Sequence, residues 1–129
     1  MRVLVIDDSR AMRSILSHML RQLGFDVSEA TNGREALARL SELERVDLAL
    51  VDWNMPEMNG IEFVRTVRAD SRYNDLPLMM VTTETEVQQV AVALQAGANE
   101  YIMKPFTKEV VQEKLVVLGL LCDQLPTTS

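Results

Sequence analysis

The chain has 129 residues, of which 47% are hydrophobic, and this length and composition suit one domain with a buried core. Its formal net charge of −6 argues against a nucleic-acid surface, because phosphate backbones require clustered lysine and arginine. No apolar run is long enough to cross a bilayer, no signal-peptide pattern begins the chain, and the single cysteine cannot form an internal disulfide. We therefore expect one cytoplasmic domain that binds neither nucleic acid nor membrane.

The hydrophobic pattern alternates between two periods along the chain. Short apolar runs predict strands at 3–6, 25–30, 48–52, 77–81 and 101–103. Apolar residues at spacings of three and four predict helices at 10–23, 34–45, 60–69, 84–96 and 107–122. Five strand-helix units in succession predict a parallel sheet with right-handed crossovers and with helices on both faces.

The third predicted strand is the most informative stretch. Leu48-Ala49-Leu50-Val51 is apolar without interruption, as in strands covered on both faces, and the strand then ends on the carboxylate of Asp52. In open α/β sheets, ligands and chemistry collect at the carboxyl ends of the strands. A simpler interpretation is that Asp52 only begins the turn through Met55-Pro56, and this stretch alone does not decide between the two.

Other predicted strands also end on polar or charged residues. The full set of such residues is Asp7, Asp8, Asp52, Thr82 and Lys104. Taken singly, Asp8 could be a helix cap, Thr82 a strand former and Lys104 a solvated tip. One parallel sheet, however, brings all five to the same edge, and their joint occurrence there favours a functional site.

This set of residues has a chemical interpretation. Three neighbouring carboxylates repel one another unless a cation lies among them, and oxygen ligands with access to water suit Mg²⁺ better than zinc. Mn²⁺ would accept the same ligands. The lysine and the hydroxyl can hold an anionic group such as a phosphoryl, and a carboxylate can itself be the nucleophile that forms an aspartyl phosphate.

These residues and their surroundings resemble a known family. Asp7-Asp8, Asp52, Thr82 and Lys104-Pro105-Phe106 are similar to the site of the receiver domains of two-component response regulators, and the similarity spans nearly the whole chain. The stretches Asp-Trp-Asn-Met-Pro at 52–56 and Ala-Gly-Ala at 96–98, with Tyr101, are most similar to the CheY-like receivers of chemotaxis.

The resemblance implies a role for each matching residue. Asp52 would be the phosphoacceptor, and Mg²⁺ would be held by Asp8, Asp52 and the backbone carbonyl of Asn54, with Asp7 acting through water. Lys104 and Thr82 would hold the phosphoryl oxygens. The aromatic side chain of Tyr101 would change rotamer together with Thr82.

The resemblance also implies a fold and partners. The fold would be a flavodoxin-like (βα)5 doubly wound sheet with strand order 2-1-3-4-5. A single receiver domain would span residues 1–124, followed by a short tail at 125–129 and no output domain. Phosphoryl would come from a sensor histidine kinase or a histidine phosphotransfer protein, and the signal would pass to a downstream output protein. No external substrate would be turned over, only transfer to Asp52 and autodephosphorylation.

Three alternatives share part of this pattern. A haloacid-dehalogenase-type phosphatase also uses an aspartate nucleophile, but it requires a second acid two residues later, where this chain has Asn54. A flavodoxin would need a phosphate loop rich in glycine and hydroxyls after the first strand, whereas Asp7-Asp8 would repel phosphate. A pseudo-receiver that binds partners without being phosphorylated remains the main alternative.

Two further predictions concern the end of the chain. The Lys104-Pro105 bond is expected to be cis, because the strand end must direct the lysine back across the site. In the last helix, one apolar stripe should face the sheet: Val111, Leu115, Leu118 and Cys122. The opposite side would expose Val116 and Leu120, flanked by Val117 and Leu121, and this patch would suit a homodimer or an output partner.

Overall fold

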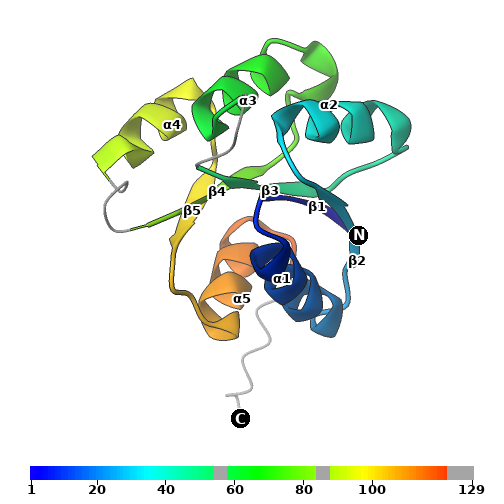
Figure 1. Cartoon of the computed structure of the whole chain (residues 1–129), viewed down its shortest axis with the longest axis vertical. Coiled ribbons are helices and arrows are strands. Elements are labelled where there is room, and N and C mark those ends of the chain that lie inside the picture. The colour runs from blue at the N-terminus through cyan, green and yellow to red at the C-terminus, as the bar shows by residue number, and fades with distance from the viewer. Residues whose placement is uncertain (54–57, 84–87, 122–129) are drawn as a thin grey trace.

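The computed structural model describes residues 1–53, 58–83 and 88–121. Its centre is one parallel sheet of five strands in the order β2-β1-β3-β4-β5 (Figure 1). The strands are β1 (Arg2–Ile6), β2 (Asp26–Ala30), β3 (Leu48–Asp52), β4 (Leu78–Thr82) and β5 (Glu100–Met103). The predicted flavodoxin-like fold and strand order are therefore confirmed.

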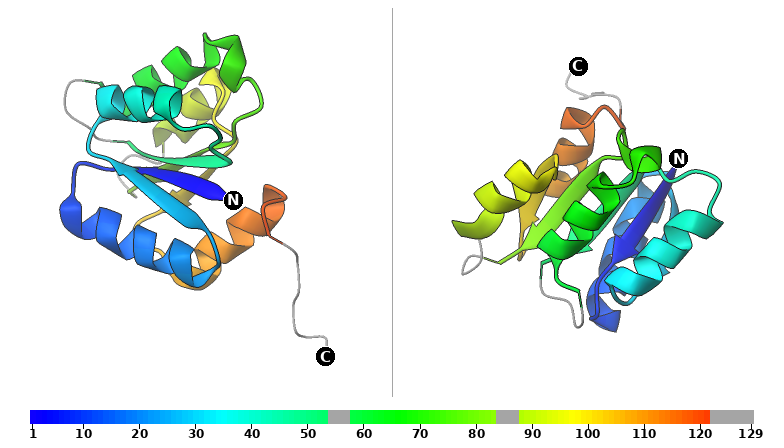
Figure 2. Two further views of the ribbon diagram at one scale, coloured as in Figure 1. Left: turned by 90° about the vertical axis from the view of Figure 1, so that its right-hand side faces the viewer. Right: turned by 90° about the horizontal axis from the view of Figure 1, so that it is seen from above.

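Helices cover both faces of this sheet. The helices are α1 (Arg10–Gln22), α2 (Gly33–Glu42), α3 (Gly60–Arg68), α4 (Val90–Ala96) and α5 (Lys108–Val117), with a 3-10 turn, η1 (Ser71–Tyr73). One face carries α1 and α5, and the other carries α2, α3 and α4 (Figures 1 and 2). None of the helices in the described part of the chain is long and apolar enough to cross a membrane.

The core consists of two clusters, one on each side of the sheet. The α2–α4 cluster includes Leu4, Ile6, Ala49, Val51, Trp53, Phe63 and Met80. The α1/α5 cluster includes Val3, Val5, Leu16, Leu48, Leu50, Val111 and Leu115. Successive residues of β3 alternate between the two clusters, and every residue of β3 and β4 is buried. This explains why those strands are apolar without interruption, since each fully buried aliphatic side chain contributes about 1.5–3 kcal/mol.

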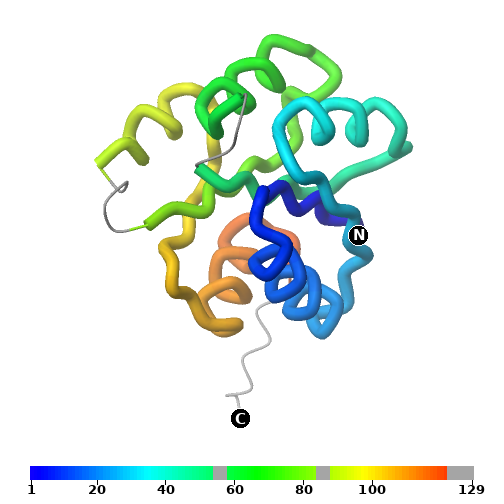
Figure 3. Tube along the Cα trace, viewed as in Figure 1, coloured from blue at the N-terminus to red at the C-terminus, as the bar shows by residue number. Residues whose placement is uncertain are grey.

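Short polar residues fix where the helices begin. The side chains of Ser9, Asn32 and Thr107 accept hydrogen bonds from backbone N–H groups in the first turns of α1, α2 and α5. At α3, Asn59 and Glu62 form a reciprocal capping box. The Ser9 cap of α1 lies three residues after the end of β1, and Figure 3 shows this short connection along the backbone.

A glycine lets α3 start close to the end of β3. A Cβ atom at Gly60 would lie 2.7 Å from Met80 Cε and 3.0 Å from the carbonyl oxygen of Asp52. The Gly60 N–H also donates to the carbonyl oxygen of Trp53 at 3.1 Å. A side chain here would push α3 away from the strand end that holds Asp52.

The last helix is shorter than predicted. It ends at Val117, whereas the sequence pattern predicted a helix to about residue 122. Gly119 has φ +78°, its N–H donates to the Val116 carbonyl oxygen at 3.0 Å, and the Leu120 N–H donates to the Leu115 carbonyl oxygen at 2.9 Å. These bonds form a Schellman motif, in which a left-handed residue ends the helix.

This early end changes the predicted exposed patch. Leu120 and Leu121 pack against the α1/α5 cluster, so their assignment to the outer side of the helix was wrong. The inner stripe is confirmed for Val111, Leu115 and Leu118, while residue 122 lies outside the described part. Of the predicted outer residues, Val116 is half-buried and Val117 is 67% exposed.

Candidate functional site

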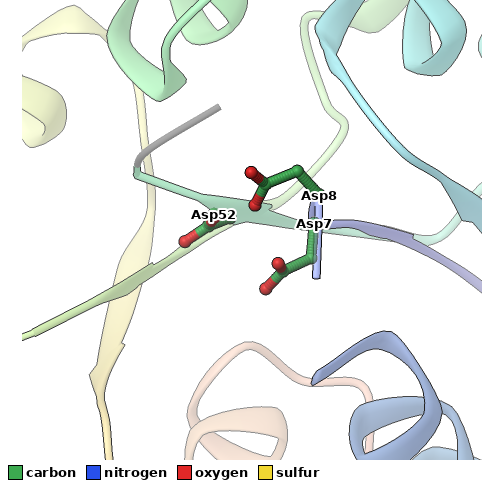
Figure 4. Close-up of side chains that lie close together, drawn as sticks. All are labelled: Asp7, Asp8 and Asp52. Atoms are coloured by element: carbon green, nitrogen blue, oxygen red, sulfur yellow. The ribbon is translucent and has the colours of Figure 1, made fainter. Parts of the chain in front are cut away.

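The carboxyl edge of the sheet brings three aspartates together. Asp7 and Asp8 follow β1, Asp52 ends β3, and these two strands are hydrogen-bonded neighbours. One carboxylate oxygen from each of the three lies within 4.8 Å of the others (Figure 4). Asp7 and Asp52 are 1% and 5% exposed, whereas Asp8 is exposed to solvent. The predicted acidic cluster is therefore present, and its open side is at Asp8.

Backbone groups fix the position of Asp7. Its N–H donates to the carbonyl oxygen of Ala30 at 3.1 Å, and its Oδ1 accepts from the N–H of Ser9 at 2.8 Å. Among the described residues, its Oδ2 is the one buried side-chain oxygen or nitrogen that has no hydrogen-bond partner. A buried carboxylate oxygen without a donor, close to two further carboxylates, is suited to a bound cation or to a water that a cation holds.

Lys104 follows β5, which lies on the other side of β4 from β3, and its side chain reaches the aspartate cluster. Its Nζ lies 3.3 Å from Asp52 Oδ1 and 3.8 Å from Asp7 Oδ2. The backbone N–H of Lys104 donates to the carbonyl oxygen of Thr82 at 2.7 Å, and the Lys104-Pro105 peptide bond is cis, as predicted. The ammonium group therefore faces both buried carboxylates at once.

Thr82 lies at the same edge, at the end of β4. Asp52 is paired in register with Val81, so Thr82 stands one residue further along the neighbouring strand. The residue is fully buried, and its hydroxyl donates to the carbonyl oxygen of Thr83 at 3.4 Å. The backbone thus places Thr82 at the same edge of the sheet as Asp52, as the strand-end pattern predicted.

A comparison with protein families identifies the arrangement. Residues 3–116 match the response regulator receiver domain. The chain belongs to this family. The resemblance inferred from the strand-end residues is thereby confirmed.

Relatives named for chemotaxis match this receiver over nearly its whole length. A chemotaxis protein CheY homolog of Campylobacter jejuni is 52% identical over 121 residues, which cover 92% of this chain and 93% of the relative. The chemotaxis protein CheY1 of Helicobacter pylori is 50% identical over 121 residues, covering 92% and 98%. The structure of CheY4 of Vibrio cholerae has a TM-score of 0.84 at 39% identity, covering 91% of this chain and 97% of that one. The receiver is therefore CheY-like in both sequence and fold.

The electrostatic field at the receiver site favours an uncharged Asp52. Burial raises the pKa of Asp52 from 3.8 to about 6, and the charge of Asp7 adds to the rise. The ammonium of Lys104 acts in the opposite direction. Burial also raises the pKa of Asp7, against the hydrogen bond from Ser9. A bound cation would relieve both penalties, because it stabilises the ionised carboxylates.

Tyr101 lies apart from the aspartate cluster, on the edge strand β5. It is half-buried and packs against the α2–α4 cluster. The Nζ of Lys114 on α5 is 5.4 Å from the centre of the Tyr101 ring and 3.1 Å from Glu100 Oε1. The predicted metal ligand Asn54 lies outside the described residues.

Sequence reasoning missed one residue of the site, Arg13. Its Nη1 donates to the carbonyl oxygen of Asp7 at 2.8 Å, from the second turn of α1. A signal for it exists, since an arginine four residues after the cap Ser9 lies one turn into the helix and can reach back to the strand end. Its partner Glu29, however, lies on another strand and cannot be recognised from local spacing.

Proposed function

We propose that this receiver accepts a phosphoryl group on Asp52 and passes the signal on through a protein-binding surface. The proposal is carried by one observation: a buried carboxylate at the end of a central strand that faces a lysine ammonium at 3.3 Å beside two further acids. Since the relatives of about 50% identity are chemotaxis proteins, we place the protein in a chemotaxis pathway.

In the proposed reaction Asp52 is the nucleophile. A bond forms between its carboxylate oxygen and phosphorus, while the phosphorus–nitrogen bond of a phosphohistidine, or the phosphorus–oxygen bond of an acyl phosphate, breaks. The electron pair of the broken bond leaves with the departing group, and an imidazole leaving group takes its proton from solvent. Asp52 must be ionised for this attack, and in the metal-free protein its raised pKa opposes ionisation, so a cation that lowers this pKa would favour the attacking form.

The residues around Asp52 have separate roles in this proposal. Lys104 directs Asp52 Oδ1 and then pairs with the phosphoryl oxygens, and the Thr82 hydroxyl turns from the Thr83 carbonyl toward them. Tyr101 then occupies space that the Thr82 side chain releases. Asp8, Asp52 and the backbone carbonyl of Asn54 would hold Mg²⁺, with Asp7 acting through water, and Mn²⁺ could replace Mg²⁺. When bound, the cation would offset the charge of the carboxylates and of the phosphoryl oxygens.

Exposed apolar side chains support a partner surface near the β5 edge of the molecule. They are Val92 and Leu94 on α4, Met103 at the end of β5, and Val110 and Val117 on α5. An output protein is the occupant that we propose, and a second copy of the chain is the alternative. Sedimentation of the apo protein and of the beryllofluoride-treated protein distinguishes them. Val117→Glu should weaken dimerisation if the dimer exists, with Ile15→Glu on α1 as the control.

The phosphoryl donor is a sensor histidine kinase or a histidine phosphotransfer protein in this proposal, and the protein acts in the cytoplasm. The presence of the full set Asp7, Asp8, Asp52, Thr82 and Lys104 at one edge speaks against a pseudo-receiver. The domain boundary expected at residue 124 falls outside the described residues and stays a prediction.

Mass spectrometry after incubation with acetyl phosphate tests the proposal. We expect one phosphoryl group per chain when Mg²⁺ is present and none in EDTA. Asp52→Asn should abolish the labelling, while Asp26→Asn, an exposed aspartate at the start of β2, should leave it unchanged. Labelling of Asp52→Asn at the wild-type level would show that Asp52 is not the acceptor.

A further inference from the structure

Arg13 connects the acidic site to a partly buried polar network that includes Glu29 and Ser17. The side chain is only 13% exposed and lies on α1, behind the turn that carries Asp7 and Asp8. Its Nη1 donates to the carbonyl oxygen of Asp7 at 2.8 Å, and its Nε lies 3.2 Å from Glu29 Oε1. One N–H of the planar guanidinium therefore donates to the Asp7 carbonyl oxygen and another donates to Glu29 on β2. The two contacts together fix the orientation of the guanidinium.

Glu29 is itself held in place. It is the penultimate residue of β2 and is paired in register with Val5 of β1. Its Oε2 accepts a hydrogen bond from the hydroxyl of Ser17 at 3.1 Å, and Ser17 is buried on α1, one turn beyond Arg13. The Glu29 carboxylate that pairs with Arg13 is thus positioned by both β2 and α1.

The contact at the Asp7 carbonyl controls the peptide unit between the two acids. The N–H of Asp7 already donates to Ala30, so a hydrogen bond on its carbonyl oxygen leaves neither side of the residue free to rotate. Because the peptide unit is planar, the direction of the Asp7 carbonyl also sets the direction from which Asp8 leaves the chain. Figure 4 shows the two carboxylates leaving on opposite sides of this turn, with Asp52 beside them.

We propose that Arg13, anchored by Glu29 and Ser17, is a positioning residue for the cation site: it holds the Asp7–Asp8 turn so that both carboxylates face a common cation beside Asp52. The inference rests on the proposed function, because it assigns the role of Arg13 through the Mg²⁺ that phosphoryl transfer requires. Arg13 touches neither the cation nor the phosphoryl group. Its effect passes through the backbone of Asp7.

Metal affinity, measured apart from phosphorylation, tests this role. The metal-free protein is titrated with MgCl₂ and followed by the fluorescence of Trp53, the single tryptophan, with titration calorimetry as a second measurement. Arg13→Gln should weaken Mg²⁺ binding roughly tenfold, as is usual when a residue behind a metal ligand is lost. Arg13→Lys should lie between this variant and the wild type, because one ammonium cannot hold both oxygen atoms in fixed directions. Glu29→Gln should weaken binding in the same direction and by less.

Two variants of the same helix separate positioning from charge and from general stability. Arg21→Gln removes an exposed positive charge from the last turn of α1, and Met19→Ala removes packing against the α1/α5 cluster. Thermal unfolding in EDTA gives the stability of each variant. We expect both controls to keep the Mg²⁺ affinity of the wild type, even where Met19→Ala unfolds at a lower temperature. Should Arg13→Gln fail to fold, Arg13→Lys and Glu29→Gln carry the test.

The outcomes distinguish the inference from the proposed function. If the wild type is labelled at Asp52 and Arg13→Gln, or the two substitute variants, bind Mg²⁺ as tightly as the wild type, the inference is wrong and the proposed function stands. A wild type that binds Mg²⁺ but is not labelled overturns the proposed function. The Mg²⁺ titrations of the Arg13 and Glu29 variants then decide whether Arg13 positions the cation site. Absence of Mg²⁺ binding by the wild type overturns both.

Discussion

Replacing Asp52 by asparagine should stabilise the metal-free protein. Burial and the charge of Asp7 raise the pKa of Asp52 from 3.8 to about 6, so the folded state resists ionisation of this side chain. Holding the carboxylate ionised in the fold costs roughly 3 kcal/mol, from about 1.36 kcal/mol for each pKa unit. Asparagine has nearly the same shape and no charge. At pH 7.5 the free energy of unfolding of Asp52→Asn should therefore exceed that of the wild type by up to about 3 kcal/mol.

The sign of this effect fixes its pH dependence. Well below pH 3.8 the carboxyl is protonated in both the folded and the unfolded state, so it carries no penalty. Between pH 4 and pH 6 the unfolded chain releases its proton while the folded protein keeps it, and the wild type loses stability as the pH rises. Above the folded pKa of about 6 the penalty is complete and constant. The advantage of Asp52→Asn should grow over this window and then level off.

Urea unfolding in EDTA, followed by the fluorescence of Trp53, measures the difference at several pH values. Asp26→Asn is the matched control, because it makes the same chemical change at an exposed position. The reasoning fails if Asp52→Asn is no more stable than the wild type at pH 7.5. It also fails if the advantage is the same at pH 4 as at pH 7.5.

Three further outcomes are expected from the same contacts. A roughly hundredfold excess of Mg²⁺ over its Kd should raise the free energy of unfolding of the wild type by about 2.7 kcal/mol, and Asp8→Asn should reduce this gain; urea unfolding with and without EDTA measures it. Lys104→Met removes the ammonium 3.3 Å from Asp52 Oδ1, so the pKa of Asp52 in the metal-free protein should rise by roughly one unit; urea unfolding in EDTA at several pH values measures this, and an unmoved pKa would contradict the electrostatic role. Gly119→Ala should cost about 1–2 kcal/mol in the same unfolding assay while leaving labelling unchanged, because nothing lies within 4 Å of the added Cβ and only the backbone at φ +78° resists it.

The sheet and the strand-end residues could be predicted because both depend on short-range patterns. The runs at Val3–Ile6 and Leu48–Val51 are apolar on both faces, and a sheet of parallel strands necessarily gathers the residues at its strand ends along one edge. The positions of Asp7, Asp52 and Lys104 were therefore implied by strand boundaries alone. Their distances, and the finding that Asp7 Oδ2 accepts no hydrogen bond, required the structure.

Two features escaped prediction for different physical reasons. The apolar spacing of the last helix continues through Leu118, Leu120 and Leu121, but Gly119 ends the helix, and the two leucines after it reach the core from a turn. A glycine at position 119 is a usual helix-ending residue, but the apolar spacing on both sides of it predicted a longer helix. Arg13 is different, because its anchor Glu29 is 16 residues away and the two meet only after β2 pairs with β1. No local pattern could have indicated that contact.

Without a bound cation, the ionised carboxylates of Asp7 and Asp52 lower the stability of the folded protein. Asp7 and Asp52 are nearly inaccessible to solvent and repel each other, and a single ammonium at 3.3 Å and 3.8 Å faces both of them. Each carboxylate has a raised pKa, so the excess negative charge is not fully offset by the fold. A cation that relieves this repulsion should bind more tightly for that reason, and in the proposed function Lys104 would also pair with the added charge of a phosphoryl group on Asp52. Because the backbone N–H of Lys104 donates to the carbonyl oxygen of Thr82, a shift of the Lys104 backbone on phosphorylation would also be felt at the ends of β4 and β5. In the proposed function, the repulsion that makes an ionised Asp52 costly in the metal-free protein would thus connect its phosphorylation to the strand ends near the proposed partner surface.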